Sequence, residues 1–460
     1  MSPLEPGAFG QDPWWIILIK VLGVFVYVLV FTIFNVWFER RVVGRMQQRK
    51  GPTMNGPLGL PQTVAEAVKL LFKEDFRPKG ADKFLFTLAP LIAGTAAFTA
   101  WSVIPIGGQV NLFGHTTQLQ LTDLPMGVLF ILSISAIGIY GVVLAGYSST
   151  SAYSLLGSIR STAQMISYEI AMGLSLVAVF LYAGSMSTHD IVEAQTQPIS
   201  LLPGWHFSGW FDLLLLPSFV IYVISMVAET NRAPFDLVEC EQELVSGYIT
   251  DYSGFRYAAY FLAEYINMMT VSAVATTLFL GGYHAPWPVT WLIAEVPGLA
   301  WLDGGWFGIV WFSIKVLIFI FLYVWLRGAL PRLRYDQFMH LGWKVLIPAN
   351  LAWIVLVAVA QVGGDRGWFS SRVLGIVAAV IIVILVVSLF IPGKAPDVRS
   401  EVSRVPGITT GVFDPFADGY PVPPMPGQIL PDEADVLVGP GGAVITAESE
   451  PEADDTGKER

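Results

Sequence analysis

The sequence is 460 residues long, with 54% hydrophobic and 13% charged residues and a mean hydropathy of +0.60. This composition excludes a soluble globular class and predicts a membrane protein. Residues 401–460 hold 12 acidic and 3 basic side chains, which accounts for most of the net charge of −10. The chain therefore lacks the basic footprint of a nucleic-acid-binding protein. Its single cysteine, Cys240, excludes an internal disulfide and an iron–sulfur cluster held by this chain alone.

The N-terminal segment leads into an apolar run that is too long for the core of a signal peptide. Glu5 and Asp12 stand where a signal would carry Lys or Arg, so we expect a retained first span. Apolar runs of roughly 20 residues, enough to cross about 30 Å of hydrocarbon, recur along the chain. They predict an all-α integral membrane helix bundle with about nine transmembrane helices. The predicted spans are residues 14–38, 84–104, 124–146, 163–183, 211–228, 256–281, 306–326, 343–362 and 372–391.

Basic residues are distributed unevenly between these spans. Ten Lys and Arg residues lie in 39–83, whereas the connections 105–123, 184–210 and 282–305 contain none. By the positive-inside rule, the basic connections face the cytoplasm. We therefore expect a multi-pass protein of the bacterial inner (plasma) membrane, with a periplasmic N-terminus and a cytoplasmic tail. Tryptophans near the predicted span ends agree with this placement, because they favour the membrane interface.

The first cytoplasmic connection combines turns, cations and an amphipathic pattern. Residues 39–59 place Arg40, Arg41 and Arg45 at the membrane surface, followed by Gly and Pro positions that impose turns. Two interpretations stay open for these cations: they orient the first span, or they dock a soluble partner or a polar headgroup. Residues 61–76 carry apolar side chains at helical spacing on one face. This pattern predicts a cytoplasmic amphipathic helix on the membrane surface.

Ionisable residues inside spans are costly in lipid, so each indicates either a function or a paired structural charge. Both interpretations are open for Lys20 and Lys315. For the glutamates we favour function, because they share one half of the membrane with an acidic stretch of the chain. The glutamates inside spans or at their cytoplasmic ends are Glu39, Glu169, Glu229 and Glu264.

The acidic stretch is ETNRAPFDLVECEQELVSGY, residues 229–248, in which five carboxylates face one cation, Arg232. Apolar residues between the charges indicate a segment packed against protein or the membrane surface. Asp236, Glu239 and Glu243 fall on one helical face. Crowded carboxylates titrate as a coupled group and can pass protons near neutral pH, which a proton relay requires. A solvated acidic loop is the alternative.

The rest of the sequence argues against a redox centre in this chain. It has no dinucleotide-binding or P-loop motif, and its five histidines fall in predicted connections, so we expect no flavin, haem or metal. From about residue 392 the chain is rich in Pro, Gly and acidic residues. We therefore expect a transmembrane domain over 1–391 and an acidic tail over 392–460 that is disordered or laid on a neighbour.

Five stretches resemble the family of membrane subunits that build the quinone tunnel of bacterial respiratory complex I, the proton-pumping NADH:quinone oxidoreductase. The likeness runs from about residue 14 to about residue 362, and the ETNRAPFDL and RYDQ elements are its most specific parts. Cys240 and Thr53 depart from the family, which usually has glycine and asparagine there. The stretches are ERRVVGRMQQRKGPTMNGPLG at 39–59, LLGSIRSTAQMISYE at 155–169, ETNRAPFDL with ECEQELVSGY at 229–248, FLAEYINM at 261–268 and PRLRYDQFMHLGWK at 331–344.

The resemblance implies roles that hydropathy does not. A tunnel that admits ubiquinone or menaquinone as substrate is implied at Arg40, Arg41, Arg45 and Gln47. NADH, flavin and the clusters are implied to belong to partners, namely the cluster-bearing and quinone-reducing peripheral-arm subunits, beside small membrane subunits and lipid. The implied proton path, which couples quinone reduction to proton translocation, is Glu169, Glu229, Asp236, Glu239, Glu241, Glu243 and Glu264.

Three other functions are weighed against this one. A related component of membrane-bound hydrogenases or other quinone-linked dehydrogenases is disfavoured by the full length of the loop 39–59. An independent proton-coupled transporter is disfavoured because no internal repeat is apparent. A structural membrane anchor differs in its consequence, since neutralising the glutamates would then be harmless.

Overall fold

The computed structural model comprises two compact units, Met1–Ile384 and Leu385–Arg460. In the second unit the described part is an antiparallel hairpin of β5 (Val436–Val438) and β6 (Val444–Thr446). The predicted span 372–391, the boundary at residue 391 and most of the predicted tail lie outside the described residues. Those residues are 12–196, 199–202, 205–207, 209–236, 245–286, 289–290, 302–303, 305–365, 436–438 and 444–446.

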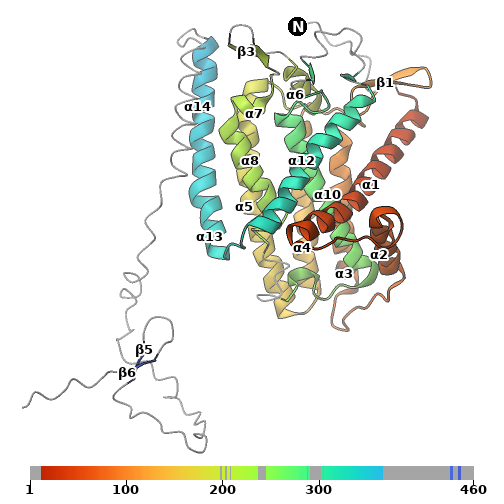
Figure 1. Ribbon diagram of the computed structural model, residues 1–460, viewed down its shortest axis with the longest axis vertical. Coiled ribbons are helices and arrows are strands. Elements are labelled where there is room, and N and C mark those ends of the chain that lie inside the picture. Colours follow the sequence, from red (N-terminus) through yellow and green to blue (C-terminus); the bar gives the residue numbers. More distant parts are fainter. Residues whose placement is uncertain are drawn as a thin grey trace, which may run out of the picture. The chain divides into compact units, whose positions relative to one another are not determined.

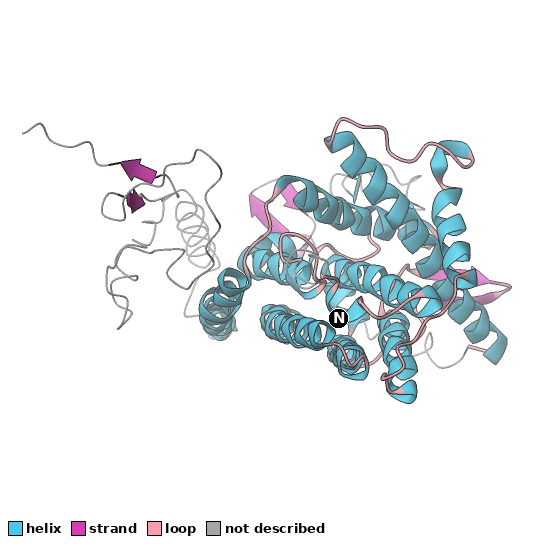
Figure 2. Ribbon diagram, turned by 90° about the horizontal axis from the view of Figure 1, so that it is seen from below, coloured by secondary structure: helices cyan, strands magenta, loops and turns pink. Residues whose placement is uncertain are grey.

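The first unit is a bundle of helices, and among its described residues six helices are long and apolar enough to span a membrane (Figure 1). Seen from below, some stand nearly end-on side by side and others cross them at an angle (Figure 2). The six are α1 (Trp14–Met46), α3 (Lys83–Thr99) with η2 (Ala100–Val103), α4 (Gly127–Ser148), α5 (Ala152–Ala183), α12 (Phe307–Ala329), and the run of α13 (Tyr335–His340), the π-helix η5 (Leu341–Leu346) and α14 (Ile347–Asp365).

Two further predicted spans coincide with helices that are shorter or more polar. They are the pair α7 (Phe211–Leu214) and α8 (Leu216–Glu229), and α10 (Gly254–Phe279). The all-α membrane prediction is thus confirmed, and eight of the nine predicted ranges fall on helices. The total of nine stays a prediction, because residues 372–391 are not described.

Helix α10 packs against α1, α3, α8 and α12, and every residue from Met268 to Phe279 is buried. Its hydroxyl side chains do not need lipid or water as partners. Thr270, Ser272 and Thr276 each donate to the carbonyl oxygen four residues earlier, at 2.7–2.9 Å. Because these hydroxyl groups form hydrogen bonds within the helix, a comparatively polar helix can occupy the interior of a membrane bundle.

The two ends of the bundle differ in the connections that they carry. Helix α2 (Pro61–Phe72) and α13 lie at one end of the first unit in Figure 1, while α6 (Thr188–Ala194) and the two short hairpins of that unit lie at the other. The basic connections thus share one end, although which end faces the cytoplasm stays a prediction. The short hairpins, which the sequence did not predict, are β1 (Gln109–Leu112) with β2 (His115–Gln118) and β3 (Ile199–Leu202) with β4 (Trp205–Phe207).

Helix α2 confirms the predicted amphipathic helix, although it ends at Phe72, four residues before the predicted end. Proline at its first position suits a helix start, since the missing N–H would have no partner there. Val64, Val68, Leu71 and Phe72 are all exposed. An apolar face of this kind is what a helix lying on a membrane surface offers to lipid.

Both lysines inside spans have partners. The Lys315 ammonium donates to the carbonyl oxygens of Leu280, Gly282 and His284, and lies 4.4 Å from the centre of the Trp210 ring. Three acceptors use all three N–H donors, so the structural interpretation is favoured for Lys315. Lys20 lies 2.6 Å from Asp12.

His284, in the connection between α10 and α12 at the α6 end of the bundle, lies between a carboxylate of the same connection and one of α6. Its Nδ1 lies 3.4 Å from the carboxylate of Asp303, and its Nε2 lies 3.9 Å from that of Glu193. Burial opposes protonation of the imidazole, but the two carboxylates outweigh it and raise the pKa of His284 from 6.5 to about 9. At neutral pH the ring is therefore an imidazolium clamped between two anions.

This clamp predicts a pH-dependent stability. Because the folded pKa of His284 lies above the unfolded value, its stabilisation is complete below about pH 6.5 and is lost as the pH rises through about 9. We expect the melting temperature of the wild type, measured in detergent, to fall more between about pH 7 and about pH 10 than that of His284→Gln. His115→Gln, at an exposed histidine at the same end, is the control and should follow the wild type. Equal pH profiles for all three proteins would contradict the clamp.

Candidate functional site

A cavity of about 950 Å³ opens at the α2 end of the bundle, between the end of α1, the loop after it, and the faces of α10 and α12. We call it the basic cavity. Its volume lies at the upper end of the range for sites that hold small molecules. Its charged lining consists of one carboxylate, Glu39, and the cations Arg40, Arg49, Lys50, Arg232 and Arg327.

The loop after α1 is held close to the helix by glycine. A Cβ added to Gly51 would lie 2.8 Å from the Cα of Arg41, and one added to Gly59 would lie 2.6 Å from the Pro52 carbonyl oxygen. Gly59 also has a φ of +77°, which L side chains rarely adopt. The turns predicted for residues 39–59 therefore form one wall of the basic cavity.

The four predicted tunnel residues divide into two groups. Arg40 and Gln47 line the basic cavity, and Arg40 also pairs with Glu66 of α2 at 2.6 Å. Arg41 is not in the lining and instead donates to the Leu58 carbonyl oxygen at 3.1 Å, which fixes the loop. Arg45 is exposed and also lies outside the lining. Helical geometry explains the division, because successive side chains of α1 point in different directions.

Glu39 is the centre of a hydrogen-bond network in the cavity wall, and only 8% of its surface is exposed. The Tyr265 hydroxyl donates to its Oε2 at 2.7 Å, and the Arg327 guanidinium pairs with its Oε1. Arg232 stacks on the Tyr265 ring at 4.5 Å. The sequence indicated a function for Glu39, as for the other glutamates inside spans or at their ends, but it did not identify Tyr265 or Arg327 as partners of Glu39.

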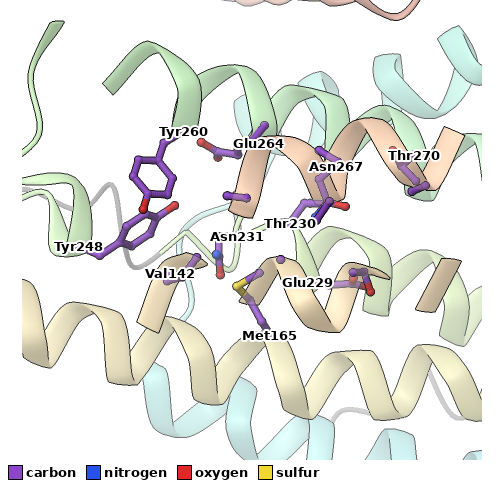
Figure 3. Close-up of a pocket in the computed structure, with 17 residues that line it drawn as sticks. Val142, Met165, Glu229, Thr230, Asn231, Tyr248, Tyr260, Glu264, Asn267 and Thr270 are labelled. Carbon is purple, nitrogen blue, oxygen red and sulfur yellow. The ribbon is translucent and has the colours of Figure 1, made fainter. Parts of the chain in front are cut away.

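A second, smaller cavity of about 80 Å³ lies between α3, α4, α5, α10 and the end of α8. We call it the acidic cavity. Figure 3 shows Tyr248 and Tyr260 at one end, Glu229 towards the other and Asn231 between them. Its volume corresponds to two or three water molecules at roughly 30 Å³ each.

Three of the predicted acidic residues meet at this cavity. Glu229 and Glu264 line it, from the end of α8 and from α10. Glu169 on α5 reaches it through Ser135, which lines the cavity and donates to Glu169 Oε1 at 2.9 Å. Asp236 is buried elsewhere, 3.4 Å from the Arg332 guanidinium. The predicted residues Glu239, Glu241 and Glu243 lie outside the described residues.

Polar atoms in the acidic cavity are poised to bind water. Glu229 is 2% exposed, and its Oε2 has no hydrogen-bond partner in the described part of the chain. The same holds for Oδ1 of Asn231, whose amide nitrogen donates to Ser161 at 3.1 Å. Asn267 and Thr270 add uncharged polar groups to the lining. Buried polar atoms without a protein partner favour bridging water, which also conducts protons.

Arg232 joins the two cavities. It lines the basic cavity, and its Nε lies 3.4 Å from Oε1 of Glu264, which lines the acidic cavity. The chain of contacts therefore runs from Glu39 through Tyr265 and Arg232 to Glu264. All of these groups are largely shielded from solvent, and electrostatic interactions between such groups are stronger than between solvated ones.

Comparison with known proteins identifies the family of this chain. A family model described as NADH dehydrogenase matches residues 19–358, which include the lining of both cavities. The H subunit of the NADH-quinone oxidoreductase of Cutibacterium acnes is 57% identical over 433 residues, covering 93% of this chain and 94% of the relative. The protein of the same name from Streptomyces avermitilis is 47% identical over 426 residues, covering 92% and 90%. The chain therefore belongs to the NADH dehydrogenase family.

Proposed function

We propose that this chain is the membrane subunit of an NADH:quinone oxidoreductase that admits quinone to the basic cavity and passes protons through the acidic cavity. The observation that carries this proposal is the contact of Arg232 with Glu264 at 3.4 Å, since it connects the two cavities. The names of the two relatives support the enzyme class.

The basic cavity suits a quinone headgroup. The two carbonyl oxygens of a quinone accept hydrogen bonds. The cavity offers hydrogen-bond donors from Arg40, Arg49, Lys50 and Arg327. Phe261 and Tyr265 add aromatic surface on the α10 side. Neither Arg41 nor Arg45 lines the cavity. We propose that Arg41 holds the loop after α1 in place and that the exposed Arg45 contributes to the docking of a soluble partner subunit.

Coupling follows from the electrostatics of the connecting residues. Reduction of a quinone places two electrons beside Glu39, and the added negative charge persists there until two protons neutralise it and complete the quinol. Tyr265 and Arg232 transmit this change to Glu264, and water in the acidic cavity links Glu264 with Glu229 and Glu169. Asp236, Glu239, Glu241 and Glu243 are proposed to extend the path.

Electron transfer is assigned to partners. We propose that flavin and iron–sulfur clusters reside in peripheral-arm subunits that dock near the basic cavity, and that small membrane subunits flank the bundle. Ubiquinone and menaquinone both fit the chemistry of the site, and this chain alone has no catalytic activity.

The acidic path is tested by amide variants. Glu229→Gln, Glu264→Gln and Glu169→Gln keep the size of the side chain but remove its ability to ionise. We expect each to lower NADH:quinone turnover and proton pumping together by about a hundredfold or more, the lower end of the range for a lost proton-transfer group. NADH oxidation by an artificial acceptor at the flavin should be unchanged.

Measurements use membranes in which equal subunit content has been confirmed. Glu74→Gln, at an exposed position, is the matched control. Glu66 is unsuitable as a control because it pairs with Arg40. Normal quinone reduction and pumping in all three variants would favour a structural anchor over a proton relay.

The connection between the cavities is tested by Tyr265→Phe. This change keeps the ring under Arg232 but removes the hydroxyl that donates to Glu39. Loss of a hydrogen bond to a charged group, about 1.5–3 kcal/mol, predicts a decrease in quinone turnover of about tenfold or more. Tyr140→Phe, at an exposed tyrosine of α4, should behave as the wild type. If steady-state kinetics are the same for both variants, the hydroxyl plays no part in coupling.

The proposed orientation in a bacterial inner membrane is tested by labelling. Phe113 in the β1–β2 hairpin and Met54 in the loop after α1 are 81% and 79% exposed, so cysteine is tolerated at either. On a Cys240→Ser background, we expect a membrane-impermeant maleimide to label Phe113→Cys from the periplasm and to leave Met54→Cys unlabelled. The opposite pattern would reverse the assigned topology.

A further inference from the structure

A third cavity lies between α1 and α12 and is almost entirely apolar. Its volume is about 270 Å³, and its walls come from one face of α1, the start of α12 and the segments around the β1–β2 hairpin. Gly23 on α1 lies 16 residues before Glu39, which corresponds to about 24 Å along the helix axis. The apolar cavity is therefore separate from the basic cavity. Its apolar lining includes Ile19, Val24, Ile106, Leu119, Trp306 and Ile309.

One cation lies at this largely apolar surface, beside the uncharged polar side chains of Gln120 and Tyr27. Lys20 lines the cavity and is 8% exposed. Its ammonium donates to Asp12 at 2.6 Å and to the carbonyl oxygen of Gln120 at 3.4 Å. An ammonium has three donors, so one of them has no acceptor among the residues described around it. The cavity thus offers a long apolar wall and a single charged hydrogen-bond donor.

The surroundings of the cavity indicate what fills it. Apolar side chains beside the cavity are exposed on α1, a helix long and apolar enough to span a membrane, so hydrocarbon chains of the bilayer are the neighbours in highest concentration. An apolar cavity gains nothing from water and takes up apolar groups instead. The exposed side chains are Ile17, Leu18, Val21, Leu22, Phe25 and Val26.

We propose that the apolar cavity is a phospholipid site, in which one acyl chain lies between α1 and α12 and an ester or phosphate oxygen accepts from Lys20. The complementarity is in both parts of the ligand: a chain without polar atoms meets the apolar wall, and an oxygen meets the remaining N–H. This inference does not depend on the proposed quinone or proton chemistry, because it uses neither of the other two cavities.

Gly23 allows the cavity to be filled without strain. A Cβ built on Gly23 meets no atom within 4 Å, so leucine can enter the cavity space with the backbone unchanged. Gly94 on α3 provides a matched control, because a Cβ there also meets nothing within 4 Å and Gly94 lies outside the cavity lining. Gly23→Leu should exclude the acyl chain, and Gly94→Leu should not.

The test uses the intact complex, reconstituted in vesicles of phosphatidylethanolamine and phosphatidylglycerol. Phosphatidylglycerol with a diazirine in the middle of one acyl chain is photolysed, and the labelled residues are mapped by mass spectrometry. In the wild type we expect labelling at Val24 and Ile309, which line the cavity and are only partly exposed, whereas Ile19 and Trp306 are exposed enough to be labelled from outside. Gly23→Leu should reduce this labelling by about tenfold per complex, while Gly94→Leu leaves it unchanged.

Other results would overturn the proposal. Labelling of the wild type confined to the outer face at Leu18, Leu22 and Val26 would show that the chain does not enter, and this result requires no variant. Absence of labelling at α1 and α12 would show that a neighbouring subunit covers the opening. Labelling of the cavity by a photoreactive quinone in preference to the phospholipid would assign the site to quinone.

Discussion

The guanidinium of Arg232 is a buried cation inside a membrane bundle, and its need for compensation constrains the surrounding structure. A charge in such a place is costly unless anions and polar groups surround it. Glu264 supplies a carboxylate at 3.4 Å and Tyr265 supplies a ring face, both from α10. The turn after α8 must therefore stay against α10. Gln164 of α5 holds the same turn, because it donates to the carbonyl oxygens of Ala228 and Phe235 at 2.8 and 3.0 Å.

This constraint gives α10 its position between the two polar cavities. Tyr265 faces the basic cavity, whereas Glu264 and Asn267 face the acidic cavity. Adjacent residues can serve two cavities because neighbouring side chains on a helix point about 100° apart. Beyond Asn267 the helix is fully buried, and its hydroxyl groups are satisfied internally. The polar region thus ends where the apolar core of the bundle begins.

Buried charges in this protein differ in the number and kind of their hydrogen-bond partners, and this difference indicates which of them have a structural role. Lys315 has carbonyl oxygens for all three of its donors, and it fixes the end of α10 to α12. Glu39 is shared between Tyr265 and Arg327 in the wall of the basic cavity. Glu229 keeps one oxygen without a partner among the described residues, next to space for water. The first arrangement stabilises the fold, while the other two are suited to respond to a change of charge.

The sequence alone determined the membrane class, the helix positions, the amphipathic α2 and the family, because hydropathy, periodicity and contiguous motifs are local properties. It also selected Glu169, Glu229 and Glu264, since charges inside apolar runs stand out. It could not tell that Arg41 and Arg45 lie outside the basic cavity, or that Glu39, Tyr265 and Arg327 meet there. Glu39 and Tyr265 are 226 positions apart, and Glu39 and Arg327 are 288 apart. Only tertiary packing decides which charges so distant in the chain compensate one another, because the low dielectric of the bundle makes each depend on its neighbours.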